Sequence, residues 1–199
     1  MLGLVIAGGR SSRFGGEKAV AVWGDRPLLL WAVERLARAC GEVAVNARPG
    51  TETEALARRW GLLVLADEPG APDGPLSGVQ AGLKWAQGRG ASSLAVSPCD
   101  VPGLPDDLYV RLVAAAGDGA AMVETSEGRQ PLCAVWPVVA LAQLTQALAG
   151  GAHPPTWRML EEAGAVKLRV DPPGAFANIN TREDLARFEA ARAATAHQR

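Results

Sequence analysis

The sequence predicts an α/β domain of three layers, with helices on both faces of a mostly parallel β-sheet. Two observations lead to this fold class. Short apolar runs alternate along the chain with longer segments of helical periodicity, which is typical of βαβ units. The first four apolar runs carry almost no polar residue, as expected for parallel strands that are buried on both faces.

The elements follow from this alternation. The predicted strands are residues 2–7, 43–46, 62–65, 94–97, 121–124, 132–136 and 166–170. The predicted helices are residues 27–39, 53–60, 76–87, 106–116, 138–148, 156–163 and 182–196. Pro27 suits the first position of its helix, and Thr181 with Asp184 forms a capping-box pattern before the last helix. The length of 199 residues, without a linker-like segment, predicts a single domain over residues 1–199.

The first strand runs directly into a loop rich in glycine and basic residues. From Gly8 to Lys18 this loop reads Gly-Gly-Arg-Ser-Ser-Arg-Phe-Gly-Gly-Glu-Lys. Successive N–H groups in such a loop form a nest for an anion, and glycine allows close approach of the backbone. Arg13 would add a bidentate guanidinium, and Lys18 would add a mobile positive charge. The loop therefore predicts a phosphate site, with a nucleotide as the expected ligand.

Two common phosphate-binding loops do not match this sequence. A P-loop needs Ser or Thr after its lysine, and Ala19 follows Lys18 here. The glycine spacing also departs from the G-x-G-x-x-G fingerprint of dinucleotide-binding folds. A nicotinamide-dependent oxidoreductase is therefore disfavoured.

Polar residues follow the first four predicted strands. Gly8 and Gly9 come after the first strand, Asn46 ends the second, Asp67 follows the third and Asp100 follows the fourth. In open α/β sheets the ligand lies beyond the carboxyl ends of the strands. We therefore expect these residues to converge on one site.

The two aspartates have a functional and a structural interpretation. An apolar strand that ends in Asp, as at Asp100, is a common way to hold Mg²⁺ together with phosphate oxygens. Asp67 could be a second carboxylate for the metal, or it could accept hydrogen bonds from a base or ribose. Alternatively, each aspartate caps a turn, before Pro102 and before Pro69 respectively.

Two later motifs are candidates for binding. Gly74-Pro75-Leu76-Ser77-Gly78 begins a helix, with Gly78 allowing close approach of a ligand or backbone. Residues 176–181 alternate like a short strand that would place Asn178 and Asn180 on one face. Paired amides at a strand end can recognise a heterocycle or hold a phosphate. The alternatives are a plain helix start and turn chemistry before the last helix.

Composition excludes several classes of function. The net charge of −1 argues against a nucleic-acid partner, which usually shows a basic stripe. No apolar run approaches the length of a membrane span, and no signal peptide is visible, so we expect a cytoplasmic protein. Cys40, Cys99 and Cys133 are widely spaced, and we expect reduced thiols and no zinc site.

Taken in order, the motifs resemble those of the molybdenum cofactor guanylyltransferase (MobA) family of nucleotidyltransferases. The loop matches A-G-G-x-S-x-R-x-G-x-x-K without a gap, and G-P-L-x-G and N-x-N-T follow at Gly74 and Asn178. The resemblance extends from Leu2 to about Phe188 and implies a Rossmann-like nucleotidyltransferase domain. Its N-terminal part would bind the nucleotide, and its C-terminal part would bind the acceptor.

The resemblance also implies a reaction. GMP would pass from GTP to molybdenum-loaded molybdopterin with Mg²⁺, giving molybdopterin guanine dinucleotide and pyrophosphate. The expected nucleotide-binding residues are Ile6, Ala7, Gly8, Gly9, Lys18, Asn46, Asp67 and Asp100. The expected catalytic residues are Arg13, Lys18 and Asp100, with Asp100 on the metal, and the acceptor would lie near Gly78, Asn178 and Asn180. Further partners could be other cofactor-biosynthesis proteins or the enzymes that receive the product.

Two other functions remain open at this point. A sister nucleotidyltransferase could use CTP or another phosphorylated acceptor, because base choice depends on a few hydrogen bonds. A nucleotide-binding regulatory protein without turnover is the other alternative. The presence of both Lys18 and Asp100 argues against it, because binding alone would not need that pair.

Overall fold

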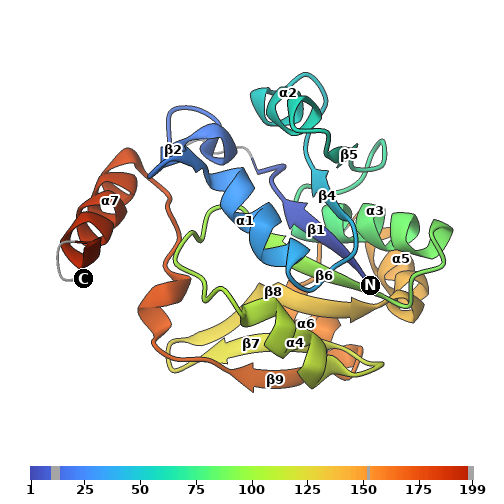
Figure 1. Ribbon diagram of the computed structural model, residues 1–199. Coiled ribbons are helices and arrows are strands. Elements are labelled where there is room, and N and C mark those ends of the chain that lie inside the picture. The colour runs from blue at the N-terminus through green and yellow to red at the C-terminus, as the bar shows by residue number, and fades with distance from the viewer. Residues whose placement is uncertain (10–13, 152, 197–199) are drawn as a thin grey trace.

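The computed structural model describes residues 1–9, 14–151 and 153–196, and a seven-stranded β-sheet runs through its centre (Figure 1). The strand order is β5-β4-β1-β6-β8-β7-β9. The strands are β1 (Leu2–Ile6), β4 (Val43–Asn46), β5 (Leu63–Leu65), β6 (Ser93–Pro98), β7 (Ala121–Thr125), β8 (Gly128–Pro137) and β9 (Val166–Arg169). Strand β8 is antiparallel to both its neighbours, and the other pairs are parallel. The predicted mostly parallel sheet is thus confirmed.

Helices cover both faces of this sheet and complete the predicted three layers (Figure 1). One face is covered by α1 (Leu28–Ala37), α2 (Glu52–Arg59) and α4 (Leu108–Ala116). The opposite face is covered by α3 (Pro75–Gly88), α5 (Leu141–Leu148) and α6 (Thr156–Glu162). A separate apolar core lies on each side of the sheet.

Strand β1 shows why the first apolar runs carry almost no polar residue. Val5 points into the core beneath α1, and Leu4 points into the core beneath α3. Both side chains are fully buried. Because successive residues of a strand face opposite sides, a strand between two helical layers needs apolar side chains at every position.

The last helix, α7 (Arg182–Ala196), lies apart from both layers (Figure 1). Its predicted capping box is present, because the Asp184 N–H donates to Thr181 Oγ1 at 3.1 Å and the Thr181 N–H donates to Asp184 Oδ2 at 2.9 Å. Phe188 packs edge-on against Trp23, which belongs to a two-residue ladder of β2 (Val22–Trp23) and β3 (Arg26–Pro27).

Some boundaries differ from the sequence expectation. The ladder of β2 and β3 was not predicted, and it places Pro27 just before α1 rather than inside it. The helix expected over residues 138–148 begins as a 3₁₀ turn, η2 (Val138–Ala140), and becomes α-helical at Leu141.

The strand expected over residues 176–181 was wrong. Residues Pro173–Phe176 form a 3₁₀ turn, η3, and residues 177–181 have no regular structure. Phe176 and Ile179 are both buried, and a spacing of three residues does not fit a strand. None of the helices in the described part of the chain is long and apolar enough to cross a membrane.

Two glycines of α3 offer a test of the packing between the helix and the sheet. A Cβ at Gly82 would lie 2.6 Å from Leu4 Cδ2, whereas a Cβ at Gly88 would meet nothing within 4 Å. We therefore expect Gly82→Ala to lower the free energy of unfolding by about 1–3 kcal/mol through overpacking. Gly88→Ala should raise it by up to about 1 kcal/mol. Urea denaturation of both variants checks this, and equal effects would contradict the close approach.

Candidate functional site

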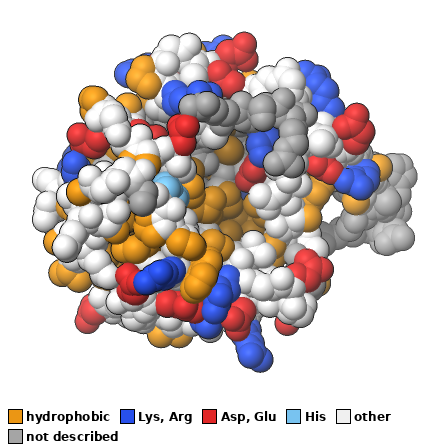
Figure 2. Space-filling view, turned by 180° about the vertical axis from the view of Figure 1, so that it is seen from behind, with side chains coloured by type: hydrophobic (Ala, Val, Ile, Leu, Met, Phe, Trp, Pro, Cys, Tyr) orange, Lys and Arg blue, Asp and Glu red, His pale blue; other side chains and the backbone are white. Residues whose placement is uncertain are grey.

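The carboxyl ends of four parallel strands lie level with one another. Ile6 pairs in register with Asn46 on one side and with Pro98 on the other, and Asn46 pairs with Leu65. A cavity of about 290 Å³ opens directly beyond these ends. Figure 2 shows the hollowed face of the molecule. Hydrophobic side chains form the floor of the hollow, and charged side chains lie around its rim.

The wall of this cavity includes every residue that the sequence assigned to the nucleotide. These residues are Ile6, Ala7, Gly8, Gly9, Lys18, Asn46, Asp67 and Asp100. Gly74 and Pro75, at the start of α3, complete one side. Arg13, which the sequence placed among the catalytic residues, lies outside the described residues.

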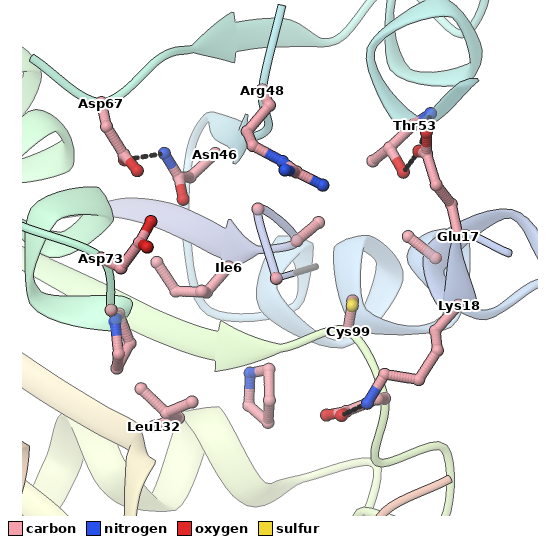
Figure 3. A pocket seen from close by; sticks show the side chains of 18 residues that line it. Ile6, Glu17, Lys18, Asn46, Arg48, Thr53, Asp67, Asp73, Cys99 and Leu132 are labelled. Atoms are coloured by element: carbon pink, nitrogen blue, oxygen red, sulfur yellow. Dashed lines mark hydrogen bonds and ion pairs between the residues drawn. The ribbon is translucent and has the colours of Figure 1, made fainter. Parts of the chain in front are cut away.

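Asn46 and Asp67 lie together at one end of the cavity (Figure 3). The Asn46 amide donates to Asp67 Oδ1 at 2.8 Å and to the Leu65 carbonyl at 3.2 Å. Asn46 is buried, with 3% of its surface exposed, and its amide is therefore held in one orientation. This end offers an amide and a carboxylate, which suit the polar edge of a base or a ribose.

Lys18 and Asp100 lie at the opposite end of the cavity. Lys18 Nζ donates to Asp100 Oδ2 at 2.5 Å and to Asn180 Oδ1 at 3.2 Å. The side chains of Lys18 and Asp100 are each 16% exposed, so the charges are partly shielded from water. Three segments far apart in the sequence thus meet at the Lys18 ammonium group.

The two asparagines predicted for the acceptor are separated. Asn180 contacts Lys18, whereas Asn178 lies in a shallow groove with Arg187 and Phe188 of α7. The expectation that the two amides share one face was wrong, because the segment that carries them is not a strand. The segment is held instead by a hydrogen bond from the Ile179 N–H to the Asp100 carbonyl at 2.8 Å.

Gly78, which was also predicted to contact the acceptor, lies beneath the end of the cavity that Asn46 and Asp67 form. A Cβ there would lie 2.3 Å from Asn46 Oδ1 and 3.0 Å from Ile6 Cδ1. The residue is buried within α3. Because Gly78 has no side chain, the Asn46 amide can pack directly against α3. This close packing explains why the position is a glycine.

Comparison with known proteins identifies the family. The model of the MobA-like NTP transferase domain matches residues 3–166. A molybdenum cofactor guanylyltransferase from Cereibacter sphaeroides is 41% identical over 191 residues, which cover 95% of each chain. One from Rhodobacter capsulatus is 39% identical over 94% of each chain. This chain belongs to the molybdenum cofactor guanylyltransferase family. It is therefore a nucleotidyltransferase.

Solved structures support the same fold. Molybdopterin-guanine dinucleotide biosynthesis protein A from Archaeoglobus fulgidus superimposes with a TM-score of 0.77 at 23% identity, covering 97% of this chain and 99% of that one. A 2-C-methyl-D-erythritol 4-phosphate cytidylyltransferase from Thermus thermophilus gives a TM-score of 0.69 at 19% identity, covering 95% and 97%. At these identities the likeness concerns the fold alone.

The cavity of this nucleotidyltransferase also contains residues that the sequence did not single out. Arg48, two residues after Asn46, points into the cavity from above Ile6 (Figure 3). Glu17 and Thr53 line the cavity near Lys18, and Asp73 lines the side next to α3. Arg48 shortly follows β4 and Asp73 shortly precedes α3, and these positions were the available signal for the two residues. Such residue types are also common in ordinary turns.

His153 has a structural partner in the fold. Its Nε2 accepts the N–H of Leu76 at 3.0 Å, so it satisfies one of the free donors at the start of α3. His153 therefore holds the loop before α6 against the start of α3, where Gly74 and Pro75 line the cavity.

Cys99 lines the cavity next to Asp100, and its environment makes it a poor nucleophile. Burial, together with the negative charge of Asp100, raises the pKa of the Cys99 thiol to about 12. A thiol with this pKa stays protonated at neutral pH, and the thiolate is the reactive form. This environment therefore does not favour nucleophilic attack by Cys99.

Substitution of Gly78, which lies beneath Asn46, tests whether the position of the Asn46 amide matters for GTP binding. Gly78→Ala should push the Asn46 amide out of place and weaken binding of GTP by about tenfold or more, equivalent to the loss of one good polar contact. Isothermal titration with GTP measures this effect. Gly88→Ala, on the same helix but far from any neighbour, is the control. Unchanged GTP affinity in Gly78→Ala would contradict the role assigned to Asn46.

Proposed function

We propose that this enzyme transfers GMP from GTP to molybdenum-loaded molybdopterin, which yields molybdopterin guanine dinucleotide and pyrophosphate. The relatives that share 39–41% of its residues carry the name of this activity. The observation that supports it most directly is the arrangement of the cavity. A fixed amide and carboxylate lie at one end, and Lys18 with Asp100 lies at the other.

The proposed chemistry needs no nucleophile from the protein. A phosphate oxygen of the acceptor attacks the α-phosphorus of GTP, and the bond from that phosphorus to the bridging oxygen breaks with release of pyrophosphate. The protein contributes by positioning the two phosphates and by neutralising the charge that develops. This scheme agrees with the protonated state of Cys99 and with the structural role of His153.

Asp100 is the residue that we propose for Mg²⁺. Magnesium in nucleotide sites is usually held by one or two carboxylates together with phosphate oxygens, and the carboxylate of Asp100, in the cavity wall beside Lys18, fits this. When bound, the ion would neutralise charge on the phosphates of the nucleotide. The ion pair between Asp100 Oδ2 and Lys18 Nζ, at 2.5 Å, places this carboxylate at the end of the cavity proposed for the phosphates.

Lys18 and Asn180 are the proposed link between the two substrates. Lys18 would contact the triphosphate, with Arg13 of the same loop as a second cation. Asn180, in the segment before α7, would contact the acceptor. In the structure Asn180 already touches Lys18, so the predicted acceptor side borders directly on the phosphate end of the cavity.

The nucleotide preference tests the proposed function as a whole. Pyrophosphate release should occur with GTP, Mg²⁺ and molybdenum-loaded molybdopterin, and it should be negligible with CTP, ATP or UTP. Omission of the pterin is the control for simple hydrolysis. Release with CTP instead of GTP would assign the chain to a sister activity, and binding of GTP without release would favour a regulatory protein.

Substitution of the ion pair tests the proposed catalytic residues. Lys18→Ala and Asp100→Ala should each lower kcat by about 100-fold or more, because the first removes a positive charge beside the phosphates and the second removes the proposed ligand of Mg²⁺. Thermal unfolding, followed in parallel, should show a folded protein. The control is Lys84→Ala, which breaks an exposed ion pair with Glu68 of 2.9 Å. A folded Asp100→Ala variant with near-normal turnover would refute the assignment of Asp100 to the metal.

A further inference from the structure

The carboxylate of Glu17, directly before Lys18, is bound to a different part of the fold. Its Oε1 accepts the N–H of Glu52 at 3.0 Å, and its Oε2 accepts the N–H of Thr53 at 2.8 Å and the Thr53 hydroxyl at 2.5 Å. Glu52 and Thr53 are the first residues of α2. Three donors from α2 therefore converge on one side chain at the end of the phosphate loop.

We propose that Glu17 is a positioning residue for GTP binding. It ties the end of the phosphate loop to α2, and it thereby holds Lys18 in the position from which Lys18 contacts the triphosphate. The proposal rests on the role that the proposed function gives to Lys18. Glu17 lies in the cavity wall beside Lys18 (Figure 3). Its carboxylate, however, is directed at α2 rather than at the ligand space.

Helix α2 has a cap of its own and does not depend on Glu17 alone. Thr51 Oγ1 accepts the N–H of Glu54 at 3.2 Å, and Glu54 Oε2 accepts the N–H of Gly50 at 2.7 Å. These bonds form a local capping arrangement around the first turn. The additional bonds to Glu17 join two segments that are 35 or more positions apart, and they therefore hold the loop as much as the helix.

The backbone around Lys18 is fixed on its other side as well. Lys18 begins a short 3₁₀ turn, η1 (Lys18–Val20), and its carbonyl accepts the N–H of Ala21 at 3.0 Å. Ala19, in the same turn, is buried with 3% of its surface exposed. Glu17 is hydrogen-bonded to α2 and Ala19 is buried in the core, so the backbone of Lys18 is held in place on both sides. The side chain reaches Asp100 from this fixed position.

The electrostatics of Glu17 suit this role in an anion site. Burial disfavours the charged carboxylate, but the hydrogen bonds from Thr53 and Glu52 outweigh burial and lower its pKa. The charge of Glu17 is therefore balanced by the positive end of the α2 dipole and by the nearby Arg48. A carboxylate balanced in this way can stand beside a triphosphate without repelling it strongly.

The test compares Glu17 with Glu54, a second carboxylate at the same end of α2. Glu17→Gln turns an amide donor toward the donors of α2, and Glu54→Gln does the same at the N–H of Gly50. Both variants lose one negative charge. We expect Glu17→Gln to raise the Kd for GTP by about tenfold, the equivalent of one good hydrogen bond, and Glu54→Gln to leave it within about twofold. Isothermal titration without acceptor gives both values, and thermal unfolding shows whether the stability losses match.

A double-substitution cycle separates positioning from general destabilisation. If Glu17 acts through Lys18, Glu17→Gln should weaken GTP binding by less than about twofold in a Lys18→Ala background. Additive effects, or an equal rise in Kd in Glu54→Gln, would overturn the proposal for Glu17. If Lys18→Ala itself binds GTP normally, the proposed role of Lys18 fails, and the inference about Glu17 fails with it.

Discussion

The register of the parallel strands is the constraint on which the rest of the site depends. Because Ile6, Asn46, Leu65 and Pro98 are paired across the sheet, the segments that follow them all begin at one level. The phosphate loop, Asp67 and Asp100 therefore line one cavity even though the chain places them far apart. A shift of one strand by one residue would turn its buried side chains to the other face, so the two apolar cores protect the geometry of the site.

Several carboxylates line the cavity, and three of them have identified hydrogen-bond or ion-pair partners. Glu17 accepts donors from α2, Asp67 accepts the Asn46 amide, and Asp100 accepts the Lys18 ammonium group. Each partner is attached to a different element. The same bonds that balance these charges therefore also hold the phosphate loop, the base end and the segment before α7 in fixed relative positions.

The sequence predicted which residues meet around the cavity wherever their position depends on the ends of strands. Apolar runs that end in Gly8, Asn46, Asp67 and Asp100 were sufficient, because parallel strands place their ends together. Two kinds of feature could not be predicted from the sequence. The alternation of residues 176–181 suggested a strand, whereas Phe176 and Ile179 are the residues that are buried. Partnerships across the fold, such as that of Glu17 with α2, leave no periodicity in the sequence and follow only from tertiary packing.

The contact between Lys18 and Asn180 also has a consequence for the order in which the site forms during synthesis. The two residues are 162 positions apart, and Asn180 lies in the segment that precedes α7. During synthesis the strands β1, β4, β5 and β6 can pair long before Asn180 leaves the ribosome. The surroundings of Lys18 can be completed only afterwards. Since contacts between distant positions form slowly, a nascent chain can form most of the cavity wall well before Asn180 reaches Lys18.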